Sequence, residues 1–391
     1  MASDTSRLGS RRVPKLGHKK SMFGCQRCRA RRVKCNEAKP ICHNCDRHGL
    51  PCIYDRDASA KTPQRSPPTE IPHTEPEEDD PPEDRTRRML ETRLMHQYLV
   101  ETGPSIAADE LTRDLFGRLV PKLSFDSDAL LYSIYTLAAL HLVKLGREDE
   151  VVGGAEKVAS QYFSMTVREH NREISQISKE TTDILCLTSS MIRCIAVVQL
   201  QGRSRVPYTS PWQWMVIIQT SVSTFIEAWK RVGPDPTSVA FRLMAATHHM
   251  RDNEKMPDTK KYQRLQHLLD HPRGPREAED WDLETQDTYD RTVAFLCSIL
   301  DLIDEEGDSS KVLRMLLLFP MLVSSRFTEL VKEESPRVLV ILAHYFALTV
   351  RFSDIWWVGN SGTDEVRGIA TILPSEWQGL LSWPLSIIEK N

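Results

Sequence analysis

The chain has 391 residues, enough for about two or three domains. Its formal net charge of −3 conceals an asymmetry, because residues 1–57 hold 14 Lys and Arg against 5 Asp and Glu, whereas the remainder holds 37 against 49. This pattern predicts a polyanionic partner for the basic N-terminal segment alone. We expect no secretory signal, because residues 1–20 are not apolar. We expect no membrane span either, because no apolar run reaches ~18 residues.

Residues 1–21 are polar and basic, with the pairs Arg11-Arg12 and Lys19-Lys20. They show no apolar periodicity, so we predict a disordered arm. The arm could add contacts to the polyanion, or serve with a later basic run as a nuclear localisation signal. A merely solvated arm is the alternative.

Six of the nine cysteines lie in the spacing C-x2-C-x6-C, which repeats after a further six residues. Zinc takes four ligands in its structural sites and favours thiolates. One zinc ion would leave two sulfurs over, whereas two zinc ions need eight ligand positions, which six sulfurs fill if two of them bridge. The bridging candidates hold equivalent places in the two halves, at Cys25 and Cys42. The predicted ligands are Cys25, Cys28, Cys35, Cys42, Cys45 and Cys52.

A disulfide framework is the alternative use of these cysteines. It requires an oxidising compartment, and without a signal peptide we favour metal. Two zinc ions and six thiolates together carry a charge of −2, and nearby cations would stabilise it. The chain supplies such cations between residues 27 and 34.

The complete spacing, with Pro40 two residues before Cys42, is similar to that of the fungal Zn2Cys6 family of binuclear zinc cluster proteins. The resemblance covers about a tenth of the chain. It implies a DNA-binding domain at residues 22–57, two bound Zn2+ ions, double-stranded DNA as a partner, and a transcription factor in the nucleus.

The two halves differ in charge. The first continues as Arg29-Ala-Arg-Arg-Val-Lys34, whereas the second is nearly neutral and is broken by Gly49 and Pro51. The family places the first helix in the major groove, so the resemblance assigns base contacts to Arg31 and Arg32, with Arg32 favoured. Arg29 and Lys34 are expected to hold phosphates. A solvated or cluster-neutralising role is the alternative for any one of these arginines.

Residues 58–84 hold seven prolines and eight acidic residues, and their only bulky aliphatic residue is Ile71. Such a segment cannot bury enough apolar surface to fold, so we predict a disordered linker. Leu90, Leu94 and Tyr98 follow as a stripe too short for a coiled coil. A homodimer is therefore left open.

Residues 85–391 show helical periodicity, and we expect a large all-α regulatory domain with a sizeable core. Ser210-Pro211 reads as a helix cap followed by proline at the first helical position. The other clear helical segments are 126–146, 181–200, 291–303 and 337–350.

The body carries no Gly-rich phosphate loop and no common hydrolase motif, so we predict no enzyme and no catalytic residues. Cys186, Cys194 and Cys297 are expected to be small buried apolar groups. The late stretches 337–346, 356–357, 372–377 and 383–384, and the earlier stretch 131–142, resemble the sterol uptake control subgroup of zinc cluster factors. In that subgroup the helical domain senses a lipid, so the resemblance favours an apolar ligand for this body and leaves open whether the effector is a lipid or sterol.

These observations predict a zinc-dependent, sequence-specific regulator of transcription by RNA polymerase II. It would read a CGG-like triplet, act with the transcription machinery or a co-regulator, and reside in the nucleus, with shuttling to the cytoplasm left open. The alternative is a scaffold that uses zinc only to fold and binds proteins through its helical body. The basic first half separates the two, because a scaffold has no need for it.

Overall fold

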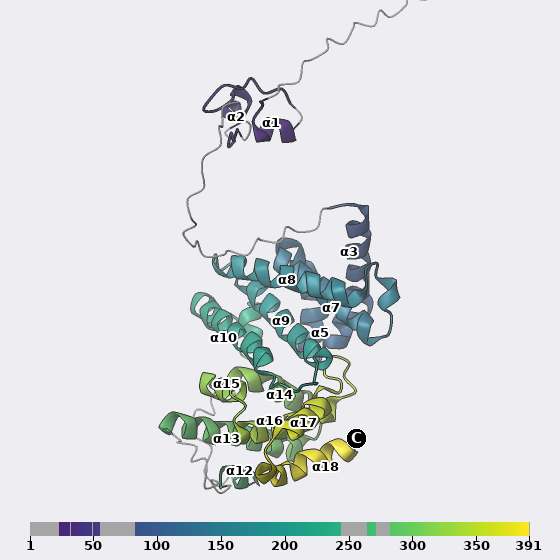
Figure 1. Ribbon diagram of the computed structural model, residues 1–391, viewed down its shortest axis with the longest axis vertical. Coiled ribbons are helices and arrows are strands. Elements are labelled where there is room, and N and C mark those ends of the chain that lie inside the picture. Colours follow the sequence, from purple (N-terminus) through teal and green to yellow (C-terminus); the bar gives the residue numbers. More distant parts are fainter. Residues whose placement is uncertain are drawn as a thin grey trace, which may run out of the picture. The chain divides into compact units, whose positions relative to one another are not determined.

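The computed structural model describes residues 23–31, 33–48, 50–54, 83–243, 264–270 and 282–390. These residues contain helices and no strand. The chain divides into two compact units, residues 1–78 and 79–391 (Figure 1). The predicted basic arm, nearly all of the predicted linker, and Arg32 lie outside the described residues.

The first unit contains two short helices, α1 (Gln26–Ala30) and α2 (His43–Arg47). Each begins directly after a cysteine whose sulfur accepts a hydrogen bond from a main-chain N–H of the first turn. Cys25 accepts from Cys28, and Cys42 accepts from Cys45. The sulfur therefore satisfies one of the N–H groups that a helix start leaves unpaired.

The second unit, here called the body, is helical. Its N-terminal half comprises α3 (Arg85–Gln97), η1 (Tyr98–Thr102), α4 (Gly103–Ile106), α5 (Glu110–Asp114), η2 (Leu115–Leu119), α6 (Val120–Leu123), η3 (Ser124–Asp126), α7 (Asp128–Lys144), η4 (Glu148–Glu150), α8 (Ala155–Ile174), α9 (Thr182–Gly202) and α10 (Trp212–Val232). Its C-terminal half comprises α12 (His267–Asp270), α13 (Leu283–Glu306), α14 (Ser310–Leu322), α15 (Ser325–Lys332), α16 (Pro336–Thr349), η7 (Val350–Phe352), α17 (Ser361–Ile372), η8 (Ser375–Leu381) and α18 (Ser382–Lys390).

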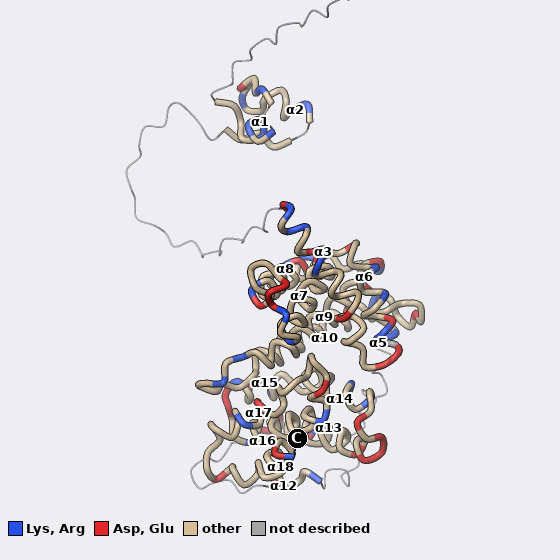
Figure 2. Tube along the Cα trace, turned by 90° about the vertical axis from the view of Figure 1, so that its right-hand side faces the viewer, with Lys and Arg blue, Asp and Glu red and all other residues tan. Residues whose placement is uncertain are grey.

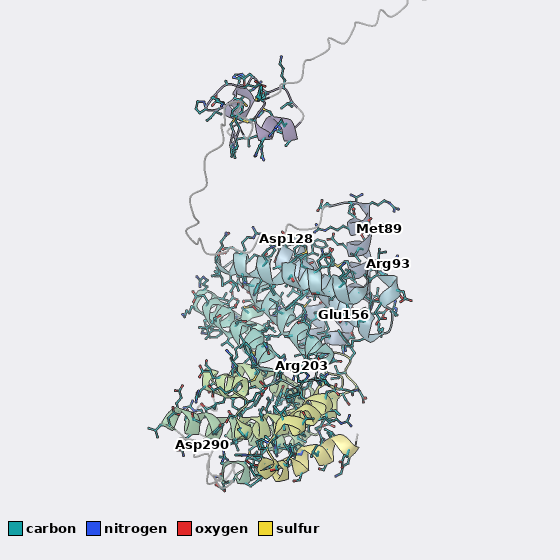
Figure 3. The ribbon with its side chains drawn as sticks, viewed as in Figure 1. Met89, Arg93, Asp128, Glu156, Arg203 and Asp290 are labelled. Carbon is teal, nitrogen blue, oxygen red and sulfur yellow. The ribbon has the colours of Figure 1, made fainter. Side chains whose placement is uncertain are left out.

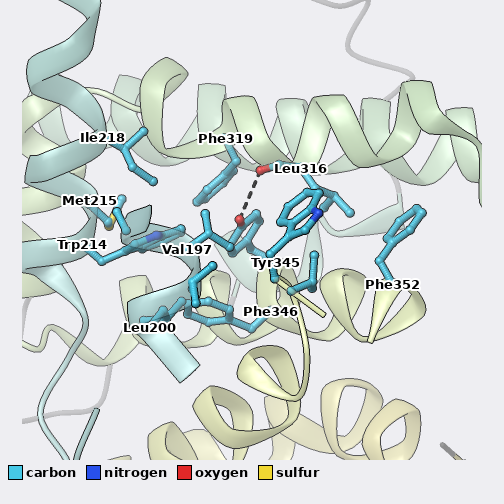
Figure 4. Packing of buried hydrophobic residues seen from close by; sticks show 14 of the residues in the cluster. Val197, Leu200, Trp214, Met215, Ile218, Leu316, Phe319, Tyr345, Phe346 and Phe352 are labelled. Atoms are coloured by element: carbon cyan, nitrogen blue, oxygen red, sulfur yellow. Dashed lines mark hydrogen bonds between the residues drawn. The ribbon is translucent and has the colours of Figure 1, made fainter. Parts of the chain in front are cut away.

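One continuous apolar core joins these helices. Helix α7 packs on α8 and α9, α9 packs on α10, and α10 packs on α14 and α15. Helix α16 lies at the centre of the C-terminal half, where residues 337–349 are all buried. Figure 4 shows its Tyr345 and Phe346 beside Trp214 of α10 and Phe319 of α14, with the Tyr345 hydroxyl donating to the Leu316 carbonyl oxygen at 3.1 Å.

The predicted helical segments correspond to α7, α9, α13 and α16. Within the described part of the chain, α9 is the helix long and apolar enough to cross a membrane, yet 72% of its most apolar window is buried inside the body. The apolar side chains of α9 therefore belong to the core of the body.

The helix cap predicted at Ser210 is wrong. Helix α10 begins at Trp212, Pro211 occupies the cap position, and no side chain caps the helix. Pro211 has φ −84° and ψ 38°, outside helical geometry, so the helix starts one residue later than predicted. The Ser210 N–H donates to the Glu334 carboxylate at 2.9 Å.

The short stripe on α3 belongs to the core. Leu94 and Tyr98 are fully buried, Leu90 packs against the same cluster, and α3 contacts α7. Met89 and Arg93, labelled in Figure 3, lie on the same helix, and Met89 is exposed. The stripe thus stabilises the body and does not form an exposed coiled-coil seam.

The end of α9 is tied to α17 by a buried ion pair. Arg203, labelled in Figure 3 where the two halves of the body meet, donates to the fully buried carboxylate of Glu365 at 2.6 Å. The Tyr208 hydroxyl donates to the same carboxylate at 2.8 Å. Both charges are therefore hydrogen-bonded, as buried charges must be.

Candidate metal centre and nucleic-acid interface

The six predicted cysteine ligands meet in one cluster. Two groups of four have all their sulfurs within 4.8 Å of one another, and the groups share Cys25 and Cys42. The first group adds Cys28 and Cys35, and the second adds Cys45 and Cys52.

The sulfur separations suit tetrahedral zinc. The Cys25 and Cys42 sulfurs are 3.8 Å apart, those of Cys25 and Cys45 are 3.7 Å apart, and those of Cys28 and Cys42 are 3.6 Å apart. In a tetrahedral site with zinc–sulfur bonds of about 2.3 Å, the sulfurs lie about 3.8 Å apart. Two tetrahedra with a shared edge therefore match the arrangement of this donor set.

The sequence repeat appears as repeated main-chain geometry. The Val33 N–H donates to the Cys28 carbonyl, and the Leu50 N–H donates to the Cys45 carbonyl in the same way. The Cys25 N–H donates to the Cys35 sulfur at 3.5 Å, and the Cys42 N–H donates to the Cys52 sulfur at 3.2 Å. Each half thus folds back on its own helix and brings its third cysteine to the cluster.

Two of the thiols, Cys28 and Cys45, are hard to ionise without a cation. Burial, reinforced by the neighbouring thiols, raises the pKa of Cys28 and raises the pKa of Cys45 to about 12. Crowded sulfurs of this kind release their protons readily to a metal ion, because ligation requires the thiolate.

Tyr54 contacts the cysteine cluster, and the sequence analysis does not predict this contact. Its hydroxyl lies 3.6 Å from the Cys35 sulfur and donates to the Ala38 carbonyl oxygen at 2.9 Å. The cysteine spacing ends at Cys52 and contains no signal for this contact, which depends on how the chain turns after the last ligand.

Three cations of the first half are exposed beside the cluster, at Arg27, Arg31 and Lys34, and Arg29 is half-buried. Figure 2 shows the blue segments of Lys and Arg at α1. In the second half, seventeen residues on, the equivalents of Arg27, Arg31 and Lys34 are Asn44, His48 and Pro51. The two halves are thus equivalent around the metal and unlike on the surface.

Neither Asn44 nor Pro51 of the second half carries a charge. The Asn44 side chain donates to the Lys34 carbonyl oxygen at 2.8 Å and so ties the two halves together. Pro51 lacks a main-chain donor and a charge. Exposed cations therefore occupy these positions in the first half and not in the second.

The remaining chemical candidates lie in the body. Cys186 and Cys297 are fully buried, as predicted, whereas Cys194 is half-buried and lines a cavity. Burial raises the pKa of Cys186 to about 12 and that of Cys194 to about 11, so both stay thiols at neutral pH. Within the described ranges, the groups of metal-ligating residues close enough to share an ion are those of the cysteine cluster.

A chain with this geometry is a binuclear zinc cluster protein, and the comparisons agree. Residues 23–61 match the fungal Zn(2)-Cys(6) binuclear cluster domain, a domain that binds two zinc ions. The chain is 30% identical over 348 residues to the Zn(2)-C6 fungal-type transcription factor afumD of Aspergillus fumigatus, covering 88% of this chain and 89% of that protein. It therefore belongs to the family of Zn(2)-C6 fungal-type transcription factors.

Two further relatives bear on the body. A Zn(2)-C6 fungal-type transcription factor of Gibberella zeae is 24% identical over 96% of this chain and 87% of that protein. Sterol uptake control protein 2 of Candida albicans is 51% identical over 37 residues, which are 10% of this chain and 5% of that protein. That match is too short to extend over the body, so the predicted likeness of the body to the sterol subgroup stays a prediction.

Membership of the family establishes the class of function. These proteins are DNA-binding regulators of transcription, they are not enzymes, and they are generally nuclear. The predicted absence of catalytic activity agrees with this class.

Proposed function

We propose that the chain is a sequence-specific regulator of transcription by RNA polymerase II, in which residues 22–57 read DNA and residues 85–391 set the outcome. Residues 1–21 and 58–84 would act as a basic arm and a spacer. The asymmetry of the module carries this proposal: exposed cations follow the first helix, and the second half lacks them at matching positions. DNA contacts of this kind need cations on one face.

The six cysteines are the proposed ligands of the two zinc ions, with Cys25 and Cys42 as the bridging pair. The support is the pair of sulfur groups that share these two residues. Zinc supplies the cross-links of a domain whose buried groups are otherwise few.

The proposed base contacts come from Arg31 and Arg32, and the proposed phosphate contacts from Arg29 and Lys34. Arginine is suited to guanine, because its paired N–H donors match the O6 and N7 acceptors. Arg31 and Lys34 are exposed and therefore accessible to DNA. The target would be a CGG-like G·C triplet.

Selection of bound sequences from random DNA, with the zinc-loaded full chain, tests this function. We expect the enriched sequences to share a G·C triplet of the CGG type. Enrichment of no sequence would support the alternative, a zinc-folded scaffold that binds proteins through its body.

For the body, we propose regulation through a co-regulator or the transcription machinery, or through a small apolar ligand. A cavity of about 190 Å³ with a largely apolar lining lies within it. This is below the ~300 Å³ at which pockets for drug-sized ligands begin, so a sterol would require the cavity to open. Melting of the protein with a lipid panel tests binding, since a ligand at 100 times its Kd adds roughly 2.7 kcal/mol.

Homodimerisation and shuttling between nucleus and cytoplasm remain predictions of the sequence. The buried stripe of α3 offers no support for a coiled-coil dimer, because Leu94 and Tyr98 are occupied by the core.

A further inference from the structure

The cavity of the body lies among α9, α10 and α14, with Trp357 as a further contributor. Val197, Ile218, Phe225, Leu317 and Met321 form much of its apolar lining. Its volume of about 190 Å³ exceeds the ~150 Å³ of an engineered apolar cavity that accepts benzene. The space is therefore large enough for a compact organic molecule.

One wall of the cavity carries a charge. Arg193 is half-buried on α9, one turn from Val197, and lines the cavity. Its guanidinium donates to the Ser190 hydroxyl at 2.9 Å and to the Ser221 hydroxyl at 3.2 Å, and it lies 4.9 Å from the centre of the Phe225 ring. These contacts fix the guanidinium in place.

Both serine hydroxyls are neutral acceptors. Each donates its own proton to a main-chain carbonyl, Ser190 to Cys186 at 2.8 Å and Ser221 to Ile218 at 2.7 Å. They are therefore oriented to accept from Arg193, but they cannot neutralise it.

Arg193 has no carboxylate partner among the residues that the structure describes. The other arginine on the cavity wall, Arg314, differs because it forms an ion pair with Asp109. Burial lowers the pKa of Arg193 from its ordinary value, yet arginine keeps its proton in proteins. A partly buried cation without a counter-charge is costly, and an anion from outside would remove that cost.

A second donor in the same wall also lacks an acceptor. Trp357 is 3% exposed and lines the cavity, and its indole N–H has no hydrogen-bond partner in the part of the chain that the structure describes. Buried indole N–H groups usually find one. The cavity thus holds a cation that lacks a counter-charge among the described residues, and this cation calls for an acidic group in an apolar ligand.

We propose that the cavity binds an apolar carboxylic acid of modest size, with its carboxylate on Arg193 and its hydrocarbon part among the side chains of α9, α10 and α14. This inference deepens the ligand-dependent form of the proposed function and rests on it. The guanidinium pairs with a carboxylate through two parallel N–H donors, and the apolar walls bury the remainder.

The test compares hexanoic acid with 1-hexanol, which has the same chain length and no charge. Binding to the zinc-loaded full chain is measured by titration calorimetry at pH 7.5, below the concentration at which either compound aggregates. We expect the acid to bind at least tenfold more tightly than the alcohol. Arg193→Met should reduce this preference to less than about twofold, because it keeps the side-chain length and removes the charge.

Matched variants separate the site from general effects. Arg193→Lys keeps the charge but not the paired N–H donors, so it should retain a part of the preference that Arg193→Met loses. Val197→Trp should block both compounds by filling the cavity. Arg291→Met, on the exposed face of α13, should bind both as the unaltered protein does. Each variant is also tested for DNA binding, which depends on the other unit and should not change.

Equal binding of acid and alcohol, binding of neither, or an unchanged preference in Arg193→Met would each overturn the assignment. Loss of binding in Arg193→Met that Arg193→Lys does not restore would also overturn it, because charge would then not be the cause. Sequence-specific DNA binding in the same samples would leave the DNA-reading function standing.

Discussion

At the residue scale, the cations of the first half are expected to recognise different parts of DNA. Arg32→Ala should cost about 1–3 kcal/mol of binding and relax the preference at one base position, because a guanine contact distinguishes bases. Lys34→Ala should weaken all sequences alike and reduce the slope of log affinity against log salt by about 1, because a phosphate contact releases a counterion. Binding titrations at several salt concentrations measure both effects.

Arg47→Ala is the control for these variants. Arg47 is exposed and lies on α2, in the half that is not expected to enter the groove. Its removal should leave sequence preference unchanged. An unaltered preference in Arg32→Ala would show that Arg32 does not read a base.

Also at this scale, the buried histidines predict a pH dependence of stability. Burial lowers the pKa of His344 to about 4. Its ring stacks on Trp383 with the ring centres 5.3 Å apart, its Nδ1–H donates to the Val340 carbonyl oxygen at 2.8 Å, and its Nε2 has no partner among the described residues. The unfolded histidine titrates near 6.5. The stabilisation is therefore complete above pH 6.5 and is lost as the pH falls toward 4, by roughly 2 kcal/mol at pH 5.

His344→Phe isolates this contribution, since phenylalanine keeps an aromatic ring against Trp383 and cannot take a proton. Urea unfolding of the variant between pH 7.5 and 5 should lose roughly 2 kcal/mol less than the unaltered protein. His170, whose pKa burial also lowers to about 4, leaves a similar pH dependence in the variant. Identical pH profiles for the two proteins would contradict the assignment.

At the scale of elements, the close approach of α17 to α16 depends on Gly362. A Cβ atom there would lie 2.5 Å from the Phe346 carbonyl oxygen and would meet the Thr349 hydroxyl as well. A main-chain oxygen cannot move aside cheaply, so Gly362→Ala should destabilise the body by about 1–3 kcal/mol. Gly379→Ala is the control, because a Cβ at Gly379 meets no atom within 4 Å. Urea unfolding compares the two, and equal stabilities would refute the packing argument.

The zinc cluster and the long helices can be predicted from the sequence, whereas features that depend on long-range packing cannot. The zinc cluster follows from cysteine spacing, since its ligands lie within 28 residues, and the long helices follow from apolar periodicity over single segments. The predicted cap at Ser210 is wrong, because Pro211 has a non-helical ψ of 38° and the helix begins at Trp212. The residues that line the cavity cannot be predicted from the sequence, because Arg193, Leu317 and Trp357 come from distant segments. Long-range packing of this kind leaves no local periodicity.

At the scale of the molecule, the two units are stabilised by different means. The buried apolar groups of the described module are its cysteines, with Tyr54 packed against them, whereas the body has a large core of its own. A strong chelator should therefore unfold the module and abolish DNA binding while the thermal transition of the body stays in place. Calorimetry and a DNA-binding assay on the same sample measure this, and metal analysis should give two zinc ions per chain. DNA binding that survives full removal of zinc would contradict the dependence.

The same separation predicts that DNA reading does not need the body. A fragment of residues 1–60 contains all six cysteines and the basic run, and zinc coordination supplies its folding free energy. Loaded with zinc, it should select the same triplet from random DNA as the full chain. Its affinity for a single triplet should match that of the full chain if the full chain binds as a monomer. A fragment that holds two zinc ions but shows no sequence preference would mean that the body takes part in recognition, and the division of labour proposed for the two units would then be wrong.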